Sequence, residues 1–159
     1  MNLLTGEESR ELFGGDVMPA VRHLIDVARN APYEQVVAAL WTAALSSPRS
    51  LAVYYLLYKL HARHGELAQA RQAAEKGIAA AAAEAGLDTQ WSAVRPGDAD
   101  FTAPGPARFW LFTLKALAFI TLRQGERDTS AGIVARLREL DPHDHVGFGV
   151  IQTLLEQTA

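Results

Sequence analysis

The chain has 159 residues, which is enough for one domain with a real core and too few for two comfortable ones. Its formal net charge of −3 argues against a nucleic-acid-binding protein, because such proteins need a basic face that releases counterions. It contains no cysteine, so disulfide scaffolds, thiol nucleophiles and cysteine-based metal centres are excluded.

No secretory or membrane-spanning segment is expected. Residues Met1–Arg10 lack a basic stretch followed by an apolar one. The most apolar segment, Phe109–Leu122, carries Lys115 and is shorter than the roughly 20 apolar residues that a spanning helix needs. We therefore predict a cytoplasmic protein in which this segment forms a buried core helix.

Apolar residues recur at helical spacing, and no alternating apolar–polar run indicates a strand, so we predict an all-α fold. Asp16 caps a first helix that breaks at Ala31-Pro32, and a second helix ends at Ser46–Pro48. Ser47-Pro48 is typical of an N-cap followed by a first-turn proline, which predicts a third helix from there to Gly65.

The alanine-rich segment Glu66–Ala85 forms the fourth predicted helix, and Gly86 ends it. The segment Gly86–Pro106 then carries strong turn signals, with one short helix expected around Thr89–Val94. Trp91 and Phe101 are expected to pin this loop to the body.

Three further helices are predicted at Ala107–Gln124, Arg127–Leu140 and Asp144–Gln157, which makes about seven main helices. Gly147 and Gly149 fall within the last of them. Each glycine costs up to about 1 kcal/mol against alanine in a helix, so close packing is expected there.

An internal repeat appears when Gly65 is aligned with Gly125. Residues of similar type then fall opposite one another: Leu51, Tyr54, Leu57, Tyr58, Gly65 and Ala70 opposite Leu111, Leu114, Leu117, Ala118, Gly125 and Ser130. In each copy, a helix of about four turns, a glycine turn and a second helix follow one another. The second copy ends in Asp141-Pro142.

These features resemble the tetratricopeptide-repeat (TPR) family over residues 51–84 and 111–144, with residues 16–47 as a degraded third copy. The resemblance implies a single domain over residues 1–159, built as a right-handed array of antiparallel helix pairs. Residues 86–106 are then an inserted loop and residues 144–157 a C-terminal helix. It also implies that the first helices of the pairs line a concave surface for a partner's peptide or helix.

The residues expected on this surface come from the third and fifth predicted helices. They combine cations with aromatic rings: Tyr55, Lys59, Arg63, Phe112, Lys115, Phe119 and Arg123. Such a set suits an acidic or amphipathic segment, because cations meet its carboxylates and rings take its apolar side chains. The alternative is that the charges are ordinary solvated residues and the phenylalanines belong to the core.

Metal and catalytic sites are not predicted. The segment Asp141–His145 contains candidate ligands, but Asp141-Pro142 is explained as a turn between repeats and Asp144 as a helix cap. His61 and His64 lie near a helix C-terminus, where their charged forms interact favourably with the helix dipole. No phosphate loop, metalloprotease motif or nucleophile elbow occurs, and no cofactor is expected.

The leading hypothesis is therefore a non-catalytic adaptor or chaperone that binds a protein or peptide, with no nucleic-acid or membrane partner. The main alternative is a structural or scaffold protein that self-associates, as a homodimer, through exposed tryptophans: Trp41, Trp91 or Trp110. A small helical enzyme or a metal-binding protein is the third alternative.

Overall fold

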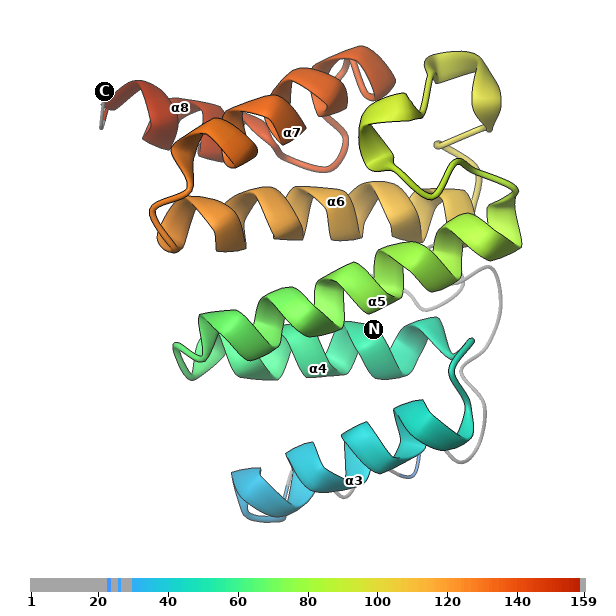
Figure 1. Cartoon of the computed structure of the whole chain (residues 1–159), viewed down its shortest axis with the longest axis vertical. Helices are drawn as coiled ribbons and strands as arrows, with labels where there is room; N and C mark the ends of the chain where they lie inside the picture. The colour runs from blue at the N-terminus through green and yellow to red at the C-terminus, as the bar shows by residue number, and fades with distance from the viewer. Residues whose placement is uncertain (1–22, 24–25, 27–29, 158–159) are drawn as a thin grey trace.

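The computed structural model describes residue 23, residue 26 and residues 30–157. These contain six α-helices and no strand, as Figure 1 shows: α3 (Tyr33–Ser46), α4 (Leu51–Arg63), α5 (Leu67–Ala85), α6 (Pro106–Arg123), α7 (Arg127–Leu140) and α8 (Gly149–Gln157). The prediction of an all-α protein is confirmed. The first predicted helix, within residues 16–31, lies outside the described residues apart from isolated positions.

The helices stack in chain order, so that each one packs against the next along the chain (Figure 1). The contacts of α5 with α4 and with α6 are the most extensive. Smaller contacts join α4 to α6 and α6 to α8. α4, α6 and α8 therefore lie next to one another, and the candidate site lies between them.

The turns after α4 and α6 have the same backbone geometry, at positions 60 residues apart. Gly65 and Gly125 have φ of 73° and 83°, a left-handed conformation that glycine adopts without steric cost. The amide of Glu66 bonds to the carbonyl of His61, and that of Glu126 to Thr121, both at 2.9 Å. The predicted alignment of Gly65 with Gly125 therefore pairs two turns of the same geometry, each between two helices.

Small residues let α5 approach its neighbours closely. Its buried face consists largely of alanine and glycine: Ala70, Ala73, Ala74, Gly77, Ala81 and Ala82. A β-carbon added at Gly77 would lie 3.1 Å from the Cβ of Tyr54 on α4 and 3.5 Å from the ring of Phe109 on α6. The distances from α5 to α4 and to α6 therefore depend on the small side chains on the buried face of α5.

Two predicted helix starts are wrong. α4 begins at Leu51 and not at Ser47-Pro48, since residues 47–50 form a preceding turn in which the amide of Ser50 donates to the carbonyl of Ser47 at 3.0 Å. The Tyr54 hydroxyl donates to the carbonyl of Pro48 at 2.7 Å and stabilises this turn once α4 has formed. α8 begins at Gly149 and not at Asp144, because Asp144 and Gly147 have positive φ values of 54° and 82° and form a turn.

The loop between α5 and α6 is attached to the body by its aromatic residues. Phe101 is buried, and its ring centroid lies 5.7 Å from that of Trp110. Trp91 is partly buried and opens a 3₁₀ turn at Trp91–Ala93, within the span where a short helix is predicted. Both aromatic residues therefore hold the loop as expected.

Candidate functional site

A cleft of about 540 Å³ opens between the second halves of α4 and α6 and the start of α8. Its lining combines basic, aromatic and small apolar residues: Tyr58, Lys59, Ala62, Arg63, Lys115, Ala116, Phe119, Ile120, Arg123, Gly147, Val150 and Ile151. Helical spacing of four residues aligns Lys59 with Arg63, and it aligns Lys115 with Phe119 and Arg123. The cleft therefore has two basic walls and an apolar third wall from α8.

The two lysines of the cleft are half-buried. Burial, followed by the charges of Lys115 and Arg63, lowers the pKa of Lys59 from its ordinary value. Burial also lowers the pKa of Lys115, and the carboxylate of Asp144 opposes that change. Two ammonium groups are thus held where water solvates them incompletely, which costs free energy unless an anion compensates.

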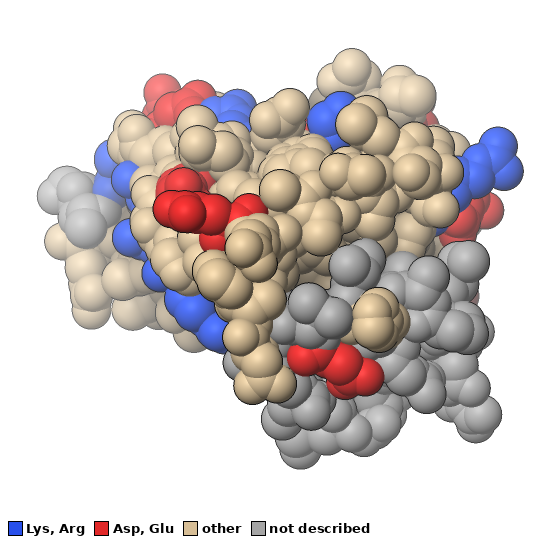
Figure 2. Space-filling model, turned by 90° about the horizontal axis from the view of Figure 1, so that it is seen from below, with Lys and Arg blue, Asp and Glu red and all other residues tan. Residues whose placement is uncertain are grey.

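Among the residues that the structure describes, none of the four cleft cations has a carboxylate within ion-pair distance. Two of the four cations lie near aromatic rings. The Nζ of Lys59 lies 5.5 Å from the ring centroid of Tyr55, and the guanidinium of Arg123 lies 5.8 Å from that of Phe119. Figure 2 shows Lys and Arg side chains in a row along one edge of the molecule, with a group of acidic side chains beside part of that row.

Asp144 is close enough to act on Lys115 electrostatically, but its carboxylate is already used. It accepts hydrogen bonds from the amides of Phe148 at 2.6 Å and Gly149 at 3.1 Å, at the start of α8. This cap holds α8 in place as the third wall. Asp144 is therefore not the N-cap that the sequence predicted, but its carboxylate binds the amides at the start of α8 from the preceding turn.

Five of the seven predicted partner-binding residues line this cleft: Lys59, Arg63, Lys115, Phe119 and Arg123. Tyr55 does not, because it is 5% exposed and packs in the core against Tyr58 and Phe109. Phe112 also lies elsewhere, beside a small hollow next to Arg108 and Leu111. Phe112 is partly buried against the core, which agrees with the alternative prediction that this phenylalanine is a core residue.

Sequence reasoning missed the contribution of α8. Val150 is 65% exposed, and Ile151 is buried at the edge of the cleft. The apolar positions of the last helix were visible in the sequence, but no local pattern indicated that it folds back against α6. The small residues Ala62 and Ala116, which leave room between the basic side chains, were also missed.

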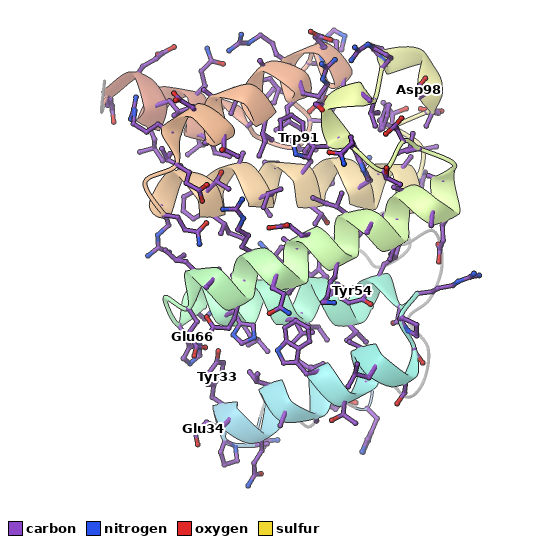
Figure 3. The ribbon with its side chains drawn as sticks, viewed as in Figure 1. Tyr33, Glu34, Tyr54, Glu66, Trp91 and Asp98 are labelled. Carbon is purple, nitrogen blue, oxygen red and sulfur yellow. The ribbon has the colours of Figure 1, made fainter. Side chains whose placement is uncertain are left out.

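A second polar cluster joins α3 to the turn between α4 and α5. Trp41 Nε1 donates to His61 Nε2 at 3.1 Å, so that nitrogen is the acceptor and Nδ1 carries the proton. His61 Nδ1 then donates to Glu66 at 3.1 Å, and the Tyr33 hydroxyl donates to the same carboxylate. Figure 3 shows Tyr33 and Glu66 pointing toward each other.

This cluster corrects the prediction that His61 is a charged partner of a helix terminus. His61 is 3% exposed, and both of its ring nitrogens have side-chain partners. His64 is exposed and stacks on Tyr33 with ring centroids 3.6 Å apart. Hydrogen bonds from Tyr33 and His61 lower the pKa of Glu66. The cluster is suited to holding α3 against the body.

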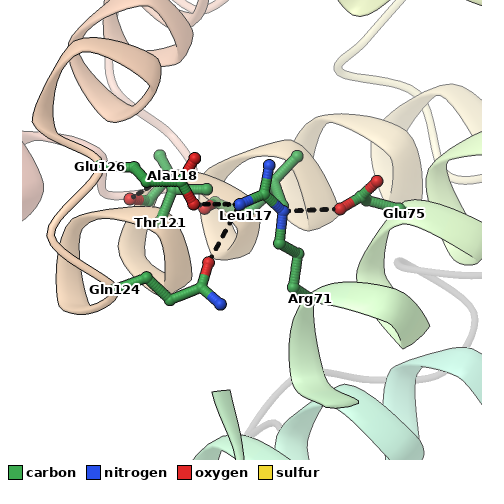
Figure 4. A network of polar contacts seen from close by, with 7 residues as sticks. All are labelled: Arg71, Glu75, Leu117, Ala118, Thr121, Gln124 and Glu126. Atoms are coloured by element: carbon green, nitrogen blue, oxygen red, sulfur yellow. Dashed lines mark hydrogen bonds and ion pairs between the residues drawn. The ribbon is translucent and has the colours of Figure 1, made fainter. Parts of the chain in front are cut away.

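A comparable cluster holds α5 against the turn between α6 and α7 (Figure 4). The Arg71 guanidinium donates to Glu75 at 2.7 Å, to Gln124 at 3.1 Å and to Glu126. These hydrogen bonds, with the ion pairs to both glutamates, raise the pKa of Arg71. The cluster therefore joins α5 to the turn between α6 and α7.

The segment Asp141–His145 forms a turn in the structure. The buried carboxylate of Asp141 accepts hydrogen bonds from the amides of His145 and Val146, both at 3.0 Å. Within the described part of the chain, no group of three histidine or acidic side chains is arranged to hold a metal ion. The Asp141 carboxylate therefore stabilises the turn that directs α8 back toward α6.

The three tryptophans do not form an exposed patch. Trp110 is 0% exposed, while Trp41 and Trp91 are partly buried against the core. The prediction that they are exposed for self-association is therefore wrong for Trp110 and has no support from the other two. None of the described helices has the length and apolar character needed to cross a membrane.

Comparisons with protein-family models, with curated proteins and with solved structures find no match to this chain.

Proposed function

We propose that this protein is a non-catalytic interaction module, an adaptor or chaperone, that binds an acidic amphipathic segment of a partner protein in the cationic cleft. The observation that carries the proposal is the convergence of four cations on one cleft without a carboxylate partner among the described residues. Two of these cations are half-buried lysines, whose desolvation an anionic partner would offset.

The apolar surface of the cleft supports an amphipathic occupant over a purely acidic one. Phe119 is 36% exposed and Val150 65%, and both border the basic side chains. A helix that presents carboxylates on one side and leucine-like side chains on the other would satisfy both kinds of surface. Its carboxylates would approach Lys59 and Lys115, and its apolar side would lie against α8.

The equivalent turns at Gly65 and Gly125 support a TPR-like origin for the pairs α4–α5 and α6–α7. On this proposal, α4 and α6 are the first helices of two degenerate units. The cleft then occupies the surface on which such units hold their partners, with α8 closing one side. A seventh helix within residues 16–31 completes the proposed array.

The experiment uses a charge swap. Wild-type protein, a Lys59→Glu/Lys115→Glu variant and a Lys76→Glu control are used to capture partners from the lysate of the native cells. The control changes the charge of an exposed lysine on α5, away from the cleft. The captured segment is then made as a peptide, and a second peptide carries lysine in place of its acidic residues.

The acidic peptide should bind wild type and the control equally, and bind the double variant at least about tenfold more weakly. Each charge-assisted hydrogen bond contributes about 1.5–3 kcal/mol, and about 1.4 kcal/mol is a factor of ten. The lysine peptide should prefer the double variant, and salt should weaken both interactions. Equal binding of the acidic peptide to all three proteins would contradict the proposal. A dimer that captures no partner would favour self-association instead.

A further inference from the structure

The chain contains three lysines, and two of them face the cationic cleft. Lys59 on α4 and Lys115 on α6 are half-buried in its walls, whereas Lys76 is exposed on α5. An amine reacts as a nucleophile in its neutral form, which desolvation and neighbouring positive charge favour. The cleft therefore gives two of the three lysines an environment that differs from that of an ordinary surface amine.

The charges around the two cleft lysines are unequal. Lys59 faces cations from both basic walls, Arg63 on its own helix and Lys115 on α6, and their charges lower its pKa together with burial. One opposing contact is the ring of Tyr55, which favours the ammonium form. Lys115 instead has the carboxylate of Asp144 nearby, which favours its charged form. Neighbouring cations therefore favour the neutral amine of Lys59, whereas the carboxylate of Asp144 opposes that change at Lys115.

We propose that Lys59 is a covalent attachment site for small aldehydes or ketones that carry an anionic group, such as a carboxylate or a phosphate. The neutral Nζ of Lys59 attacks the carbonyl carbon to give a carbinolamine. Loss of the carbonyl oxygen as water then leaves a carbon–nitrogen double bond, an imine, to Lys59. No oxidant or reductant is needed, and hydrolysis reverses the step.

The other cations of the cleft supply the selectivity for an anion. Lys115 and Arg123 lie on the wall opposite Lys59, and Arg63 lies one turn along α4. They attract the anionic group while the carbonyl reaches Lys59, and Phe119 and Val150 border the space for the carbon skeleton. A volume of about 540 Å³ lies within the range of about 300–1,000 Å³ typical of small-molecule sites.

Attachment at Lys59 goes beyond peptide binding and does not depend on it, whereas the regulation of the cleft described next rests on the proposed function. An imine at Lys59 would replace one cation of the cleft with a bulky anionic group. Such an adduct would prevent an acidic segment from binding, so the abundance of a small metabolite would regulate the cleft.

The test uses pyridoxal 5′-phosphate as the anionic aldehyde and pyridoxal as its counterpart without phosphate. The full-length protein is incubated briefly with each at neutral pH, reduced with borohydride and mapped by peptide mass spectrometry. Lys76 is the internal control. With the phosphate probe, Lys59 should be labelled severalfold faster than Lys76, because the cations near Lys59 favour its neutral amine and attract the phosphate. With pyridoxal the preference should fall.

Two variants extend the test, and their folding is checked by thermal melting. Lys115→Gln should slow the labelling of Lys59, because it removes a charge that both lowers the proton affinity of Lys59 and attracts the probe. Lys115→Arg should preserve it. Equal labelling of Lys59 and Lys76, faster labelling of Lys115, or the same preference with pyridoxal would each overturn the proposal. Because no peptide takes part, these outcomes leave the peptide-binding proposal to its own experiment.

Discussion

Replacing glycine by alanine should have opposite effects on stability at Gly77 in α5 and at Gly132 in α7. Gly77 and Gly132 both lie within helices, at ordinary negative φ. A β-carbon at Gly77 would lie 3.1 Å from the Cβ of Tyr54, which is closer than normal van der Waals contact. A β-carbon at Gly132 would lie 3.7 Å from the ring of Trp91, an ordinary contact.

The expected magnitudes follow from these distances. Glycine to alanine stabilises a helix interior by about 1 kcal/mol, and this gain applies at both positions. At Gly77 it is opposed by overpacking, which costs about 1–3 kcal/mol in a well-packed core. Tyr54 cannot yield easily, because it is buried and its hydroxyl is bonded to Pro48. Gly77→Ala should therefore lower the free energy of unfolding by up to about 2 kcal/mol, and Gly132→Ala should raise it by about 0.5–1 kcal/mol.

Urea unfolding followed by circular dichroism at 25 °C measures both changes, and equal slopes against urea would show that the same structure unfolds in each variant. Gly77→Ala should also weaken ligand binding in the cleft, since it pushes α5 away from α4 and α6. If Gly77→Ala stabilised the protein as much as Gly132→Ala, the reasoning that α5 sets the spacing of these helices would be refuted.

Three further substitutions test the polar groups by urea unfolding. Trp41→Phe leaves the buried Nε2 of His61 without a donor and should cost about 1–3 kcal/mol; no change would refute the acceptor assignment. Arg71→Met should cost at most about 1 kcal/mol, and the cost should shrink in salt, because its ion pairs are partly exposed. Lys115→Met should stabilise the protein at neutral pH, because it removes a half-buried charge. The folded pKa of Lys115 is lowered, so the unfolded chain binds more protons between that pKa and 10.5. Wild-type stability therefore rises with pH in this window, and the advantage of the variant should shrink there.

The sequence predicted the ends of α5 and α7 closely, because residues at the ends themselves determine where these helices stop. α7 has the predicted bounds, and α5 differs by one residue and ends at Gly86, whose φ is 72°. The start of α4 was missed although Ser47-Pro48 satisfies a capping rule. The bond from Tyr54 to Pro48 forms only when α4 is already helical, so a pattern of neighbouring residues does not reveal it.

The site was partly predictable for a related reason. Helical spacing groups Lys59 with Arg63 and Lys115 with Arg123 without knowledge of the tertiary fold. Tyr55 was assigned to the same surface because it lies four residues before Lys59 on the same helix. In the structure every residue of Leu51–Tyr58 is buried, so the first half of α4 has no solvent face. That difference arises from packing against neighbouring helices, which the periodicity of one helix does not contain.

The positions of the four cleft cations along α4 and α6 show which of them stabilise their helix through its dipole and which do not. Arg63 and Arg123 are the final residues of α4 and α6, where the carbonyl ends of the helix dipole favour positive charge. Lys59 and Lys115 lie before the last turn, where that effect has faded, and both are half-buried. Helix stability therefore accounts for the arginines and not for the lysines. The same neutralisation should then have opposite effects, because Arg123→Gln loses a favourable dipole interaction while Lys115→Met removes a desolvated charge. A destabilised Lys115→Met protein would mean that the ammonium is already compensated within the fold, and the argument for an anionic occupant of the cleft would lose its basis.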